Sequence, residues 1–283
     1  KTVSNFVRIS SVRPVLPSRL ASIFPRRFHR HGSESRTHSR SLGLRKPCNE
    51  WRTLLVVEYA EPLIPGRLIK RYKRFFADIE TDAGVVTAHC ANTGRMTGLL
   101  SEGAPVWIRR QPPGRKLHYA WELVETSCCL ACVNTARANE LVALSDLSIW
   151  IQHASLVRRE PRVGARRFDL ELSREGQPAY VEIKSVTLCN EGGRGLFPDA
   201  PSVRATQHVR LLTEMAQTGI ETHLLWVAMH TGIRSVAPHR ELDSDFAVAC
   251  RDAKAAGVHI QAVSANITPQ GMSLSGVIAC SVD

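Results

Sequence analysis

The chain has 283 residues, 43% of them hydrophobic, and a formal net charge of +11. This length predicts two compact domains, and no apolar run approaches the ~18 residues of a membrane span, so we expect no membrane partner. Eight cysteines are too few for a disulfide scaffold in a chain of this length, which favours a reducing compartment such as the cytoplasm.

The positive charge is concentrated near the N-terminus. Residues 1–49 hold eleven lysines and arginines but a single acid, Glu34, so the rest of the chain is nearly neutral. The stretch "RRFHRHGSESRTHSRSLGLRKP" has the composition of a disordered arm or of an organelle transit segment. We therefore expect residues 1–57 to form a basic arm or leader, and net charge alone does not predict a nucleic-acid partner.

Residues 58–133 form a series of short strand-like runs separated by glycine-bearing turn signals. About five short strands in so short a segment predict a small barrel, such as the five-stranded oligonucleotide-binding (OB) barrel. The runs are "RLIKRYKRFFADIET", "GVVTAHCAN", "PVWIRR", "KLHYAWELVET" and "CCLACVNT".

Within the first run, "KRYKRFF" (70–76) interleaves basic and aromatic residues. Basic groups bind phosphates and aromatic rings stack on bases in single-strand grooves. The candidate nucleic-acid-binding residues are therefore Lys70, Arg71, Lys73 and Arg74. The alternative is a strand with a solvated basic face, and for Phe75 and Phe76 we favour a place in the barrel core.

Cys129 and Cys132 are spaced as half of a zinc or redox motif. No second Cys/His pair stands nearby at zinc-finger spacing. Thiols packed as small hydrophobic side chains are therefore favoured over a zinc site.

From residue 134 to the C-terminus, helical and strand patterns alternate, which predicts an α/β layer with a central sheet. Hydrophobic periodicity and helix start and stop signals define the elements. Expected helices cover 136–160, 202–219 and 243–257, and expected strands cover 166–173, 179–188, 221–230 and 258–265.

Two of these strands flank "SREGQP", a turn signal that predicts a hairpin. If residues 175–176 form a two-residue loop, the register of the two strands follows. Leu170 then lies opposite Val181 and Phe168 lies opposite Ile183, with all four side chains on one core face.

The same register places Asp169 opposite Glu182 on the other face. Like charges directly opposite one another destabilise a sheet, so such a pair shares a proton or holds a cation. Carboxylate oxygens suit Mg²⁺ or Mn²⁺, and Lys184 on the same face could orient water or stabilise transition-state charge. Glu160, at the end of the preceding predicted helix, could supply a third carboxylate. The alternative is a solvated polar face, and a slip of one residue would reverse every side chain.

An aspartate, a hairpin and then Glu-x-Lys resemble the PD-(D/E)xK nuclease superfamily. From about residue 66 onward the chain more specifically resembles the sugar fermentation stimulation protein family. This resemblance implies an OB-like barrel followed by a PD-(D/E)xK nuclease-like α/β domain with a central mixed sheet, and DNA binding. It is carried by six ordered segments: "HCANTGRMTGLL", "YAWELV", "CVNTARANELV", "FDLEL", "YVEIKSVTL" and "FPDAPSVRATQHVRLL".

Carried over by position, the resemblance implies a nuclease site with Asp169 and Glu182 as metal ligands and Lys184, Glu160, Arg204 and His208 as catalytic residues. Arg204 and His208 are four residues apart and would share a helix face. The chain departs from the family pattern before Phe168, where about two residues fewer are present and Arg167 replaces a small polar residue. This departure affects the expected spacing of Glu160 from the site.

We therefore expect a DNA-binding protein with a divalent-metal-dependent phosphodiesterase site. A second interpretation is a non-catalytic DNA-binding regulatory protein on the same fold, related to sugar metabolism by the family resemblance. A third is an RNA-directed protein, since recognition of the 2′-hydroxyl has no short motif. The sequence leaves open the oligomeric state, a homodimer included, and organelle targeting by residues 1–57 as an alternative to a cytoplasmic location.

Overall fold

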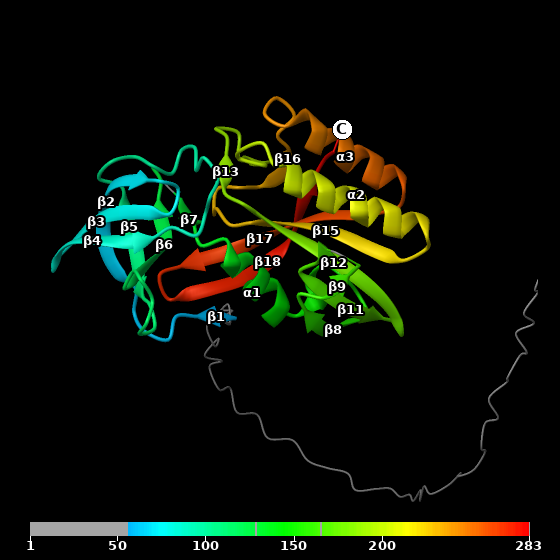
Figure 1. The fold of residues 1–283 in the computed structure, drawn as a ribbon, viewed down its shortest axis with the longest axis horizontal. Coiled ribbons are helices and arrows are strands. Elements are labelled where there is room, and N and C mark those ends of the chain that lie inside the picture. Colours follow the sequence, from blue (N-terminus) through cyan, green and yellow to red (C-terminus); the bar gives the residue numbers. More distant parts are fainter. Residues whose placement is uncertain (1–55, 128, 165, 283) are drawn as a thin grey trace, which may run out of the picture. The chain divides into compact units, whose positions relative to one another are not determined.

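The computed structural model describes residues 56–127, 129–164 and 166–282. The predicted basic arm therefore lies outside the described residues, apart from its last two. The described part contains a six-stranded sheet and a ten-stranded sheet (Figure 1). No helix in this part is long and apolar enough to cross a membrane.

The six-stranded sheet forms the predicted OB-like barrel. Its strand order is β4-β3-β2-β5-β6, and a parallel pairing of β4 with β6 closes the ring. Leu68, Ile108 and Trp121 fill the interior. Fully buried Cys132, in the added strand β7, packs as a small hydrophobic side chain, as expected. The strands are β2 (Ile64–Tyr72), β3 (Phe76–Thr81), β4 (Gly84–His89), β5 (Pro105–Arg110), β6 (Tyr119–Glu125) and β7 (Leu130–Cys132).

The basic and aromatic run 70–76 is a hairpin rather than one continuous strand. Strand β2 ends before Lys73 and Arg74, which form a tight turn with φ angles of 47° and 63°. Phe75 is 46% exposed, so its predicted place in the core is wrong. Phe76 is half-buried and stacks on Tyr72 with ring centroids 5.5 Å apart. The turn at residues 73–74 interrupts the strand alternation and turns the Phe75 side chain out to solvent.

The ten-stranded sheet is mixed, as predicted for the α/β domain. Strands β12, β15 and β17 run parallel, whereas β11 pairs with β12 and β18 with β17 in antiparallel fashion. Strand β1, near the expected start of the barrel, pairs with β18 of this sheet, and the domain boundaries stay predictions. The strands are β1 (Val57–Glu58), β8 (Ala154–Arg159), β11 (Leu170–Arg174), β12 (Gln177–Val186), β13 (Leu188–Cys189), β14 (Arg194–Phe197), β15 (Glu221–Ala228), β16 (Ser235–Pro238), β17 (His259–Thr268) and β18 (Gly271–Cys280).

Helices cover both faces of this sheet. Helices α2 (Val203–Gln217) and α3 (Ser244–Ala255) lie side by side on one face (Figure 1). Their N-termini are capped by Ser202 and Asp243, whose side chains accept backbone N–H groups, a favourable start for a helix. Helix α1 (Ala136–Leu144) packs on the opposite face. The face that carries Glu182 is therefore covered by α2, which overturns the solvated-face interpretation.

The predicted helix 136–160 is wrong beyond Leu144. A short 3₁₀ helix follows at 147–149, and 154–159 is strand β8. Both the backbone N–H and the hydroxyl of Ser145 donate to Leu141 O, and Asp146 accepts the N–H of Ser148. Such side-chain bonds compete with helix continuation. Glu160 consequently follows a strand rather than a helix.

The hairpin register is confirmed from Leu170 to Arg174, which pair with Val181 to Gln177. Both residues of the predicted loop 175–176 have positive φ angles, 51° and 81°, as a type I′ turn requires. The predicted pairing of Phe168 with Ile183 is wrong. Phe168 lies before the first paired residue and packs in the core on the α2 side, whereas Ile183 packs on the α1 side.

Candidate metal centre

Asp169 is fixed immediately before β11 by contacts to its backbone and to both carboxylate oxygens. Its backbone N–H donates to Val181 O (3.1 Å). Its Oδ2 accepts the backbone N–H of Ile183 (2.7 Å), and its Oδ1 accepts Nδ2 of Asn139 in α1 (2.6 Å). Strand β12 and helix α1 together therefore set the position of this carboxylate.

Glu182 is buried, at 3% exposure, between β12 and α2. Its Oε1 contacts the Lys184 ammonium and lies 2.6 Å from Nδ1 of His208. Its Oε2 is also buried but has no hydrogen-bond partner in the described part of the chain. A buried carboxylate oxygen without a partner is unfavourable, so this atom favours the approach of a cation.

The two carboxylates influence each other's ionisation. Burial, and then the charge of Glu182, raise the pKa of Asp169 to about 6. Burial also acts to raise the pKa of Glu182. The hydrogen bond with His208 and the charge of Lys184 outweigh burial, so the pKa of Glu182 is lowered. Two such carboxylates fit a divalent cation, which would relieve their repulsion. No group of three or more His, Cys, Asp or Glu side chains with metal-site geometry occurs within the described ranges, so further ligands would be water or substrate oxygens.

His208 comes from the middle of α2 and is 5% exposed. Its ring packs edge-on against Phe168, with centroids 6.3 Å apart. Arg204, four residues earlier, is exposed, and its side chain makes no hydrogen bond or ion pair with any described residue. The structure thus brings Asp169, Glu182, Lys184 and His208 together, and it leaves Arg204 at the surface.

Only the backbone of Glu160 contacts the candidate metal centre. Its N–H donates to Asp169 O (2.8 Å), but its carboxylate pairs with Arg167 (3.1 Å). Both side chains of this pair are more than half exposed. The structure therefore does not place the Glu160 carboxylate with Asp169 and Glu182.

Sequence reasoning missed Asn139. This residue belongs to "CVNTARANELV", one of the segments that carry the family resemblance. Its contact with Asp169 joins residues 30 positions apart, and no spacing rule predicts it. A polar residue amid the apolar positions of α1 was the only local signal.

The predicted basic residues of the barrel have different roles. Arg71 donates to the carbonyl oxygens of Arg74 (2.9 Å) and Asn92 (2.7 Å) and so braces the hairpin. Lys70 lies 3.9 Å from the Asp78 carboxylate. Lys73 and Arg74, at the turn, are exposed and are the two that remain available to a ligand.

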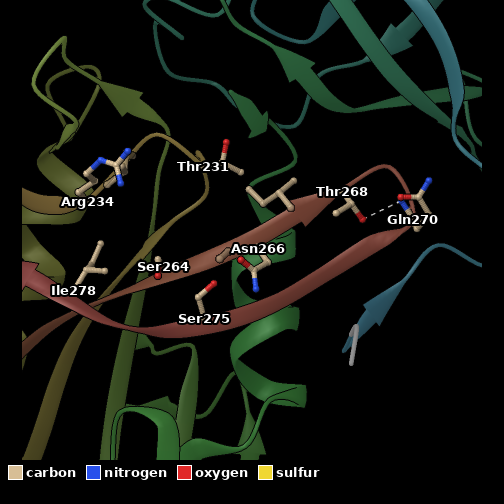
Figure 2. Close-up of a pocket in the computed structure, with 11 residues that line it drawn as sticks. Thr231, Arg234, Ser264, Asn266, Thr268, Gln270, Ser275 and Ile278 are labelled. Atoms are coloured by element: carbon tan, nitrogen blue, oxygen red, sulfur yellow. Dashed lines mark hydrogen bonds between the residues drawn. The ribbon is translucent and has the colours of Figure 1, made fainter. Parts of the chain in front are cut away.

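A groove of about 860 Å³ lies elsewhere, along β17, β18 and the loop 231–234. Figure 2 shows Ser264, Asn266 and Ser275 on the two strands, with Arg234 on the loop. Arg234 is the only charged residue in its lining, and no carboxylate or imidazole is present there. This groove therefore lacks the groups that the candidate metal centre provides.

Comparisons with known proteins match both domains. Residues 69–133 match the SfsA N-terminal OB domain and residues 135–271 match the sugar fermentation stimulation protein RE domain. A sugar fermentation stimulation protein homolog from Ectopseudomonas mendocina is 42% identical over 227 residues, which cover 77% of this chain and 97% of that protein. One from Pseudomonas aeruginosa is 41% identical over 228 residues, with the same coverage. The structure of Pyrococcus furiosus SfsA in complex with Ca²⁺ superposes with a TM-score of 0.73 at 24% identity, over 81% of this chain and 99% of that one, which confirms the fold. The chain belongs to the sugar fermentation stimulation protein family.

Proposed function

We propose that this protein is a divalent-metal-dependent phosphodiesterase that acts on DNA. The observation that carries the proposal is the buried, unpartnered Oε2 of Glu182 next to Asp169, whose pKa is raised by burial and by the charge of Glu182. The similar Pyrococcus furiosus protein was solved in complex with Ca²⁺, which supports a divalent cation at this centre. We expect Mg²⁺ or Mn²⁺ to be the working cofactor.

Asp169 and Glu182 would hold the cation. A divalent ion there would lower the pKa of water and neutralise charge on a phosphate oxygen. Asn139 and the Ile183 N–H hold the two oxygens of Asp169, and His208 holds Oε1 of Glu182, so both carboxylates are fixed in orientation. The Lys184 ammonium, in contact with Glu182, is placed to position the attacking water or to stabilise charge on the phosphate.

Two predicted residues need the substrate or a rearrangement to take part. Arg204 is exposed near the start of α2 and could contact a phosphate that lies over the site. Glu160 would have to leave Arg167 before its carboxylate could assist the metal. On the barrel, Lys73 and Arg74 would hold the sugar-phosphate backbone of the strand.

A non-catalytic DNA-binding protein is the second candidate. It is favoured by the contact between the Lys184 ammonium and Glu182 Oε1, because this cation already neutralises one of the two carboxylates. In that case the acidic pair would stabilise the fold, and the barrel would supply the affinity for DNA.

Calorimetric titration of Mn²⁺ and Mg²⁺ into the full chain tests the metal centre. We expect saturable binding that is lost in an Asp169→Asn, Glu182→Gln double variant. Glu171→Gln is the matched control, because Glu171 lies on the same hairpin but pairs with Arg158.

Cleavage is tested on single-stranded and double-stranded DNA and on RNA, with and without metal. Full activity of an Asp169→Ala, Glu182→Ala variant would rule out the proposed catalytic site. DNA binding with neither metal binding nor cleavage would favour the second candidate, and cleavage of RNA alone would change the substrate class.

A further inference from the structure

A second cavity, of about 290 Å³, is lined in part by β12, the strand that carries Glu182 and Lys184. Barrel and α/β-domain residues both line it, and Ser185 in its wall directly follows Lys184 on β12. We call it the junction cavity. Its size is at the lower end for ligand sites, which suits one small group rather than a duplex. The residues used below are Arg74, Asn92, Thr135, Ser185, Thr187, Asp199 and Ser202.

The N-termini of two helices reach this cavity. Thr135 precedes α1, Ser202 precedes α2, and both residues are part of the lining. Neither helix has an acidic residue in its first turn. Asn134 Oδ1 accepts the Ala136 N–H of α1 (3.3 Å) and Ser202 Oγ accepts the Ala205 N–H of α2 (3.2 Å), so each end keeps only part of its N–H groups for a ligand. Helix N-termini carry partial positive charge and unpaired N–H groups. Their convergence favours an anion over a neutral ligand.

The cavity wall also holds hydrogen-bonding side chains without partners. Thr187 is 5% exposed, and its hydroxyl makes no hydrogen bond within the described part of the chain. The Ser185 hydroxyl oxygen is buried and likewise has no partner there. Asn92, 6% exposed, accepts the N–H of Gly94 with Oδ1 (2.8 Å), which leaves its Nδ2 as a donor. The Thr187 hydroxyl and Asn92 Nδ2 are therefore donors that a ligand in the cavity could use.

The lining contains one charged side chain of each sign. Arg74 supplies a guanidinium from the tip of the β2–β3 hairpin, and Asp199 is the only acid. The Asp199 carboxylate is itself engaged, because Oδ2 accepts the backbone N–H of Met96 (3.1 Å). A side chain at Gly94 would displace this carboxylate. Asp199 therefore joins the barrel to the loop before α2, and Ser202 caps this helix.

We propose that the junction cavity binds a phosphate group of a nucleic-acid strand, beside the phosphate that the carboxylate centre would attack. The nucleic-acid source of this phosphate rests on the proposed function, whereas the binding of a phosphate group does not. The phosphate could be a terminal monoester or an internal diester of the strand. Both present the oxygen acceptors that the two helix N-termini, Arg74, Asn92 and Thr187 would satisfy.

The test uses the full chain in the presence of EDTA, so that no metal contributes. Inorganic phosphate and the dinucleotide TpT, with and without a 5′-phosphate, are titrated by calorimetry. Asn92→Asp keeps the acceptor for Gly94 N–H but replaces the free donor by a charged oxygen, and we expect affinity for phosphate to fall about tenfold or more. Thr187→Val preserves shape, and removal of the hydroxyl should weaken binding by roughly threefold to tenfold.

The matched control is Asn266→Asp, which makes the same change of charge in the groove of Figure 2 and should leave phosphate affinity unchanged. Thermal unfolding verifies that each variant is folded. Equal affinity of the Asn92→Asp and Asn266→Asp variants, or no phosphate binding by the parent protein, would overturn the proposal. Tighter binding of 5′-phosphorylated TpT identifies a terminal phosphate, and equal binding of both dinucleotides identifies an internal one.

The Asp169→Asn, Glu182→Gln variant separates this proposal from the proposed function. We expect it to keep phosphate binding in EDTA while it loses metal binding. If it loses phosphate binding as well, the anion binds at the carboxylate centre and the cavity assignment is wrong. If the parent protein binds phosphate but cleaves no substrate, the proposed catalytic function fails while the cavity assignment stands.

Discussion

At the scale of single residues, the centre is asymmetric because both partners of Glu182 use the same oxygen. Lys184 and His208 contact Oε1, and Oε2 stays without a partner. The alternation of residues in β12 predicted that Glu182 and Lys184 share a face, and the turn signal predicted the register of β11 with β12 from Leu170 to Arg174. The burial of that face by α2 could not be predicted, because a period of two describes a strand and not what packs against it.

The raised pKa of Asp169 makes metal binding depend on pH. Because its pKa is about 6, the carboxyl must lose a proton before it can act as a ligand. Affinity for Mn²⁺ should therefore be highest above pH 7 and fall as the pH drops through 6. We expect affinity at pH 5 to be about tenfold weaker than at pH 7, measured by calorimetry at constant ionic strength. An affinity that is constant over this range would contradict the assignment of Asp169.

Asn139 is proposed to position Asp169 and not to bind the metal itself, and this role can be tested. Asn139→Asp preserves shape but places a like charge next to Asp169 Oδ1, which disfavours ionisation of both groups. We expect the pH midpoint of Mn²⁺ binding to rise by roughly one unit. Asn266→Asp is the control, because Asn266 contacts Ser273 in the groove of Figure 2 rather than Asp169. An unchanged midpoint would mean that Asn139 only supports the packing of α1.

At the scale of elements, the sequence predicted the helices that begin with a side-chain cap. It failed where a side-chain hydrogen bond ends a helix before its hydrophobic pattern does. Helices α2 and α3 begin at Ser202 and Asp243, whose cap bonds can be anticipated from sequence. The helix expected over 136–160 ends early, because Ser145 bonds back to Leu141. Strand β18, "GMSLSGVIAC", was not predicted, since its small and polar residues give no clear alternation and its pairing with β17 supplies the order.

The β2–β3 hairpin yields a prediction about binding to DNA. Each phosphate contact that is lost lowers the dependence of affinity on salt. Lys73→Ser and Arg74→Ser should each reduce the slope of log affinity against log salt by about one, measured by fluorescence anisotropy on a labelled oligonucleotide. Lys70→Ser should reduce it less, because Lys70 lies near Asp78. Equal slopes for all variants would remove the hairpin tip from the binding surface.

At the scale of the whole molecule, helix α1 connects the barrel to the candidate metal centre. Its Arg137 Nε donates to Glu122 of β6 (2.9 Å), a residue with no exposed surface that also accepts Arg109 Nε of β5 (3.0 Å). Two positions further along α1, Asn139 holds Asp169. The order of the domains could be predicted from the resemblance. The contact between α1 and Glu122 could not be predicted, because it depends on how the two domains pack and not on the sequence pattern of either domain alone.

Removal of Glu122 tests whether its ion pairs with Arg109 and Arg137 support both domains. Glu122→Ala leaves two arginines without their buried acceptor, and loss of one partner of a buried ion pair destabilises a protein by about 3–5 kcal/mol. Urea denaturation should show this loss, whereas Glu171→Ala, which breaks the more exposed pair with Arg158, should change stability by less than about 1 kcal/mol. We also expect the Glu122→Ala variant to bind Mn²⁺ more weakly, because α1 then orients Asn139 less firmly against Asp169. Unchanged Mn²⁺ affinity in a destabilised variant would show that the Glu122 ion pairs support the fold without positioning the candidate metal centre.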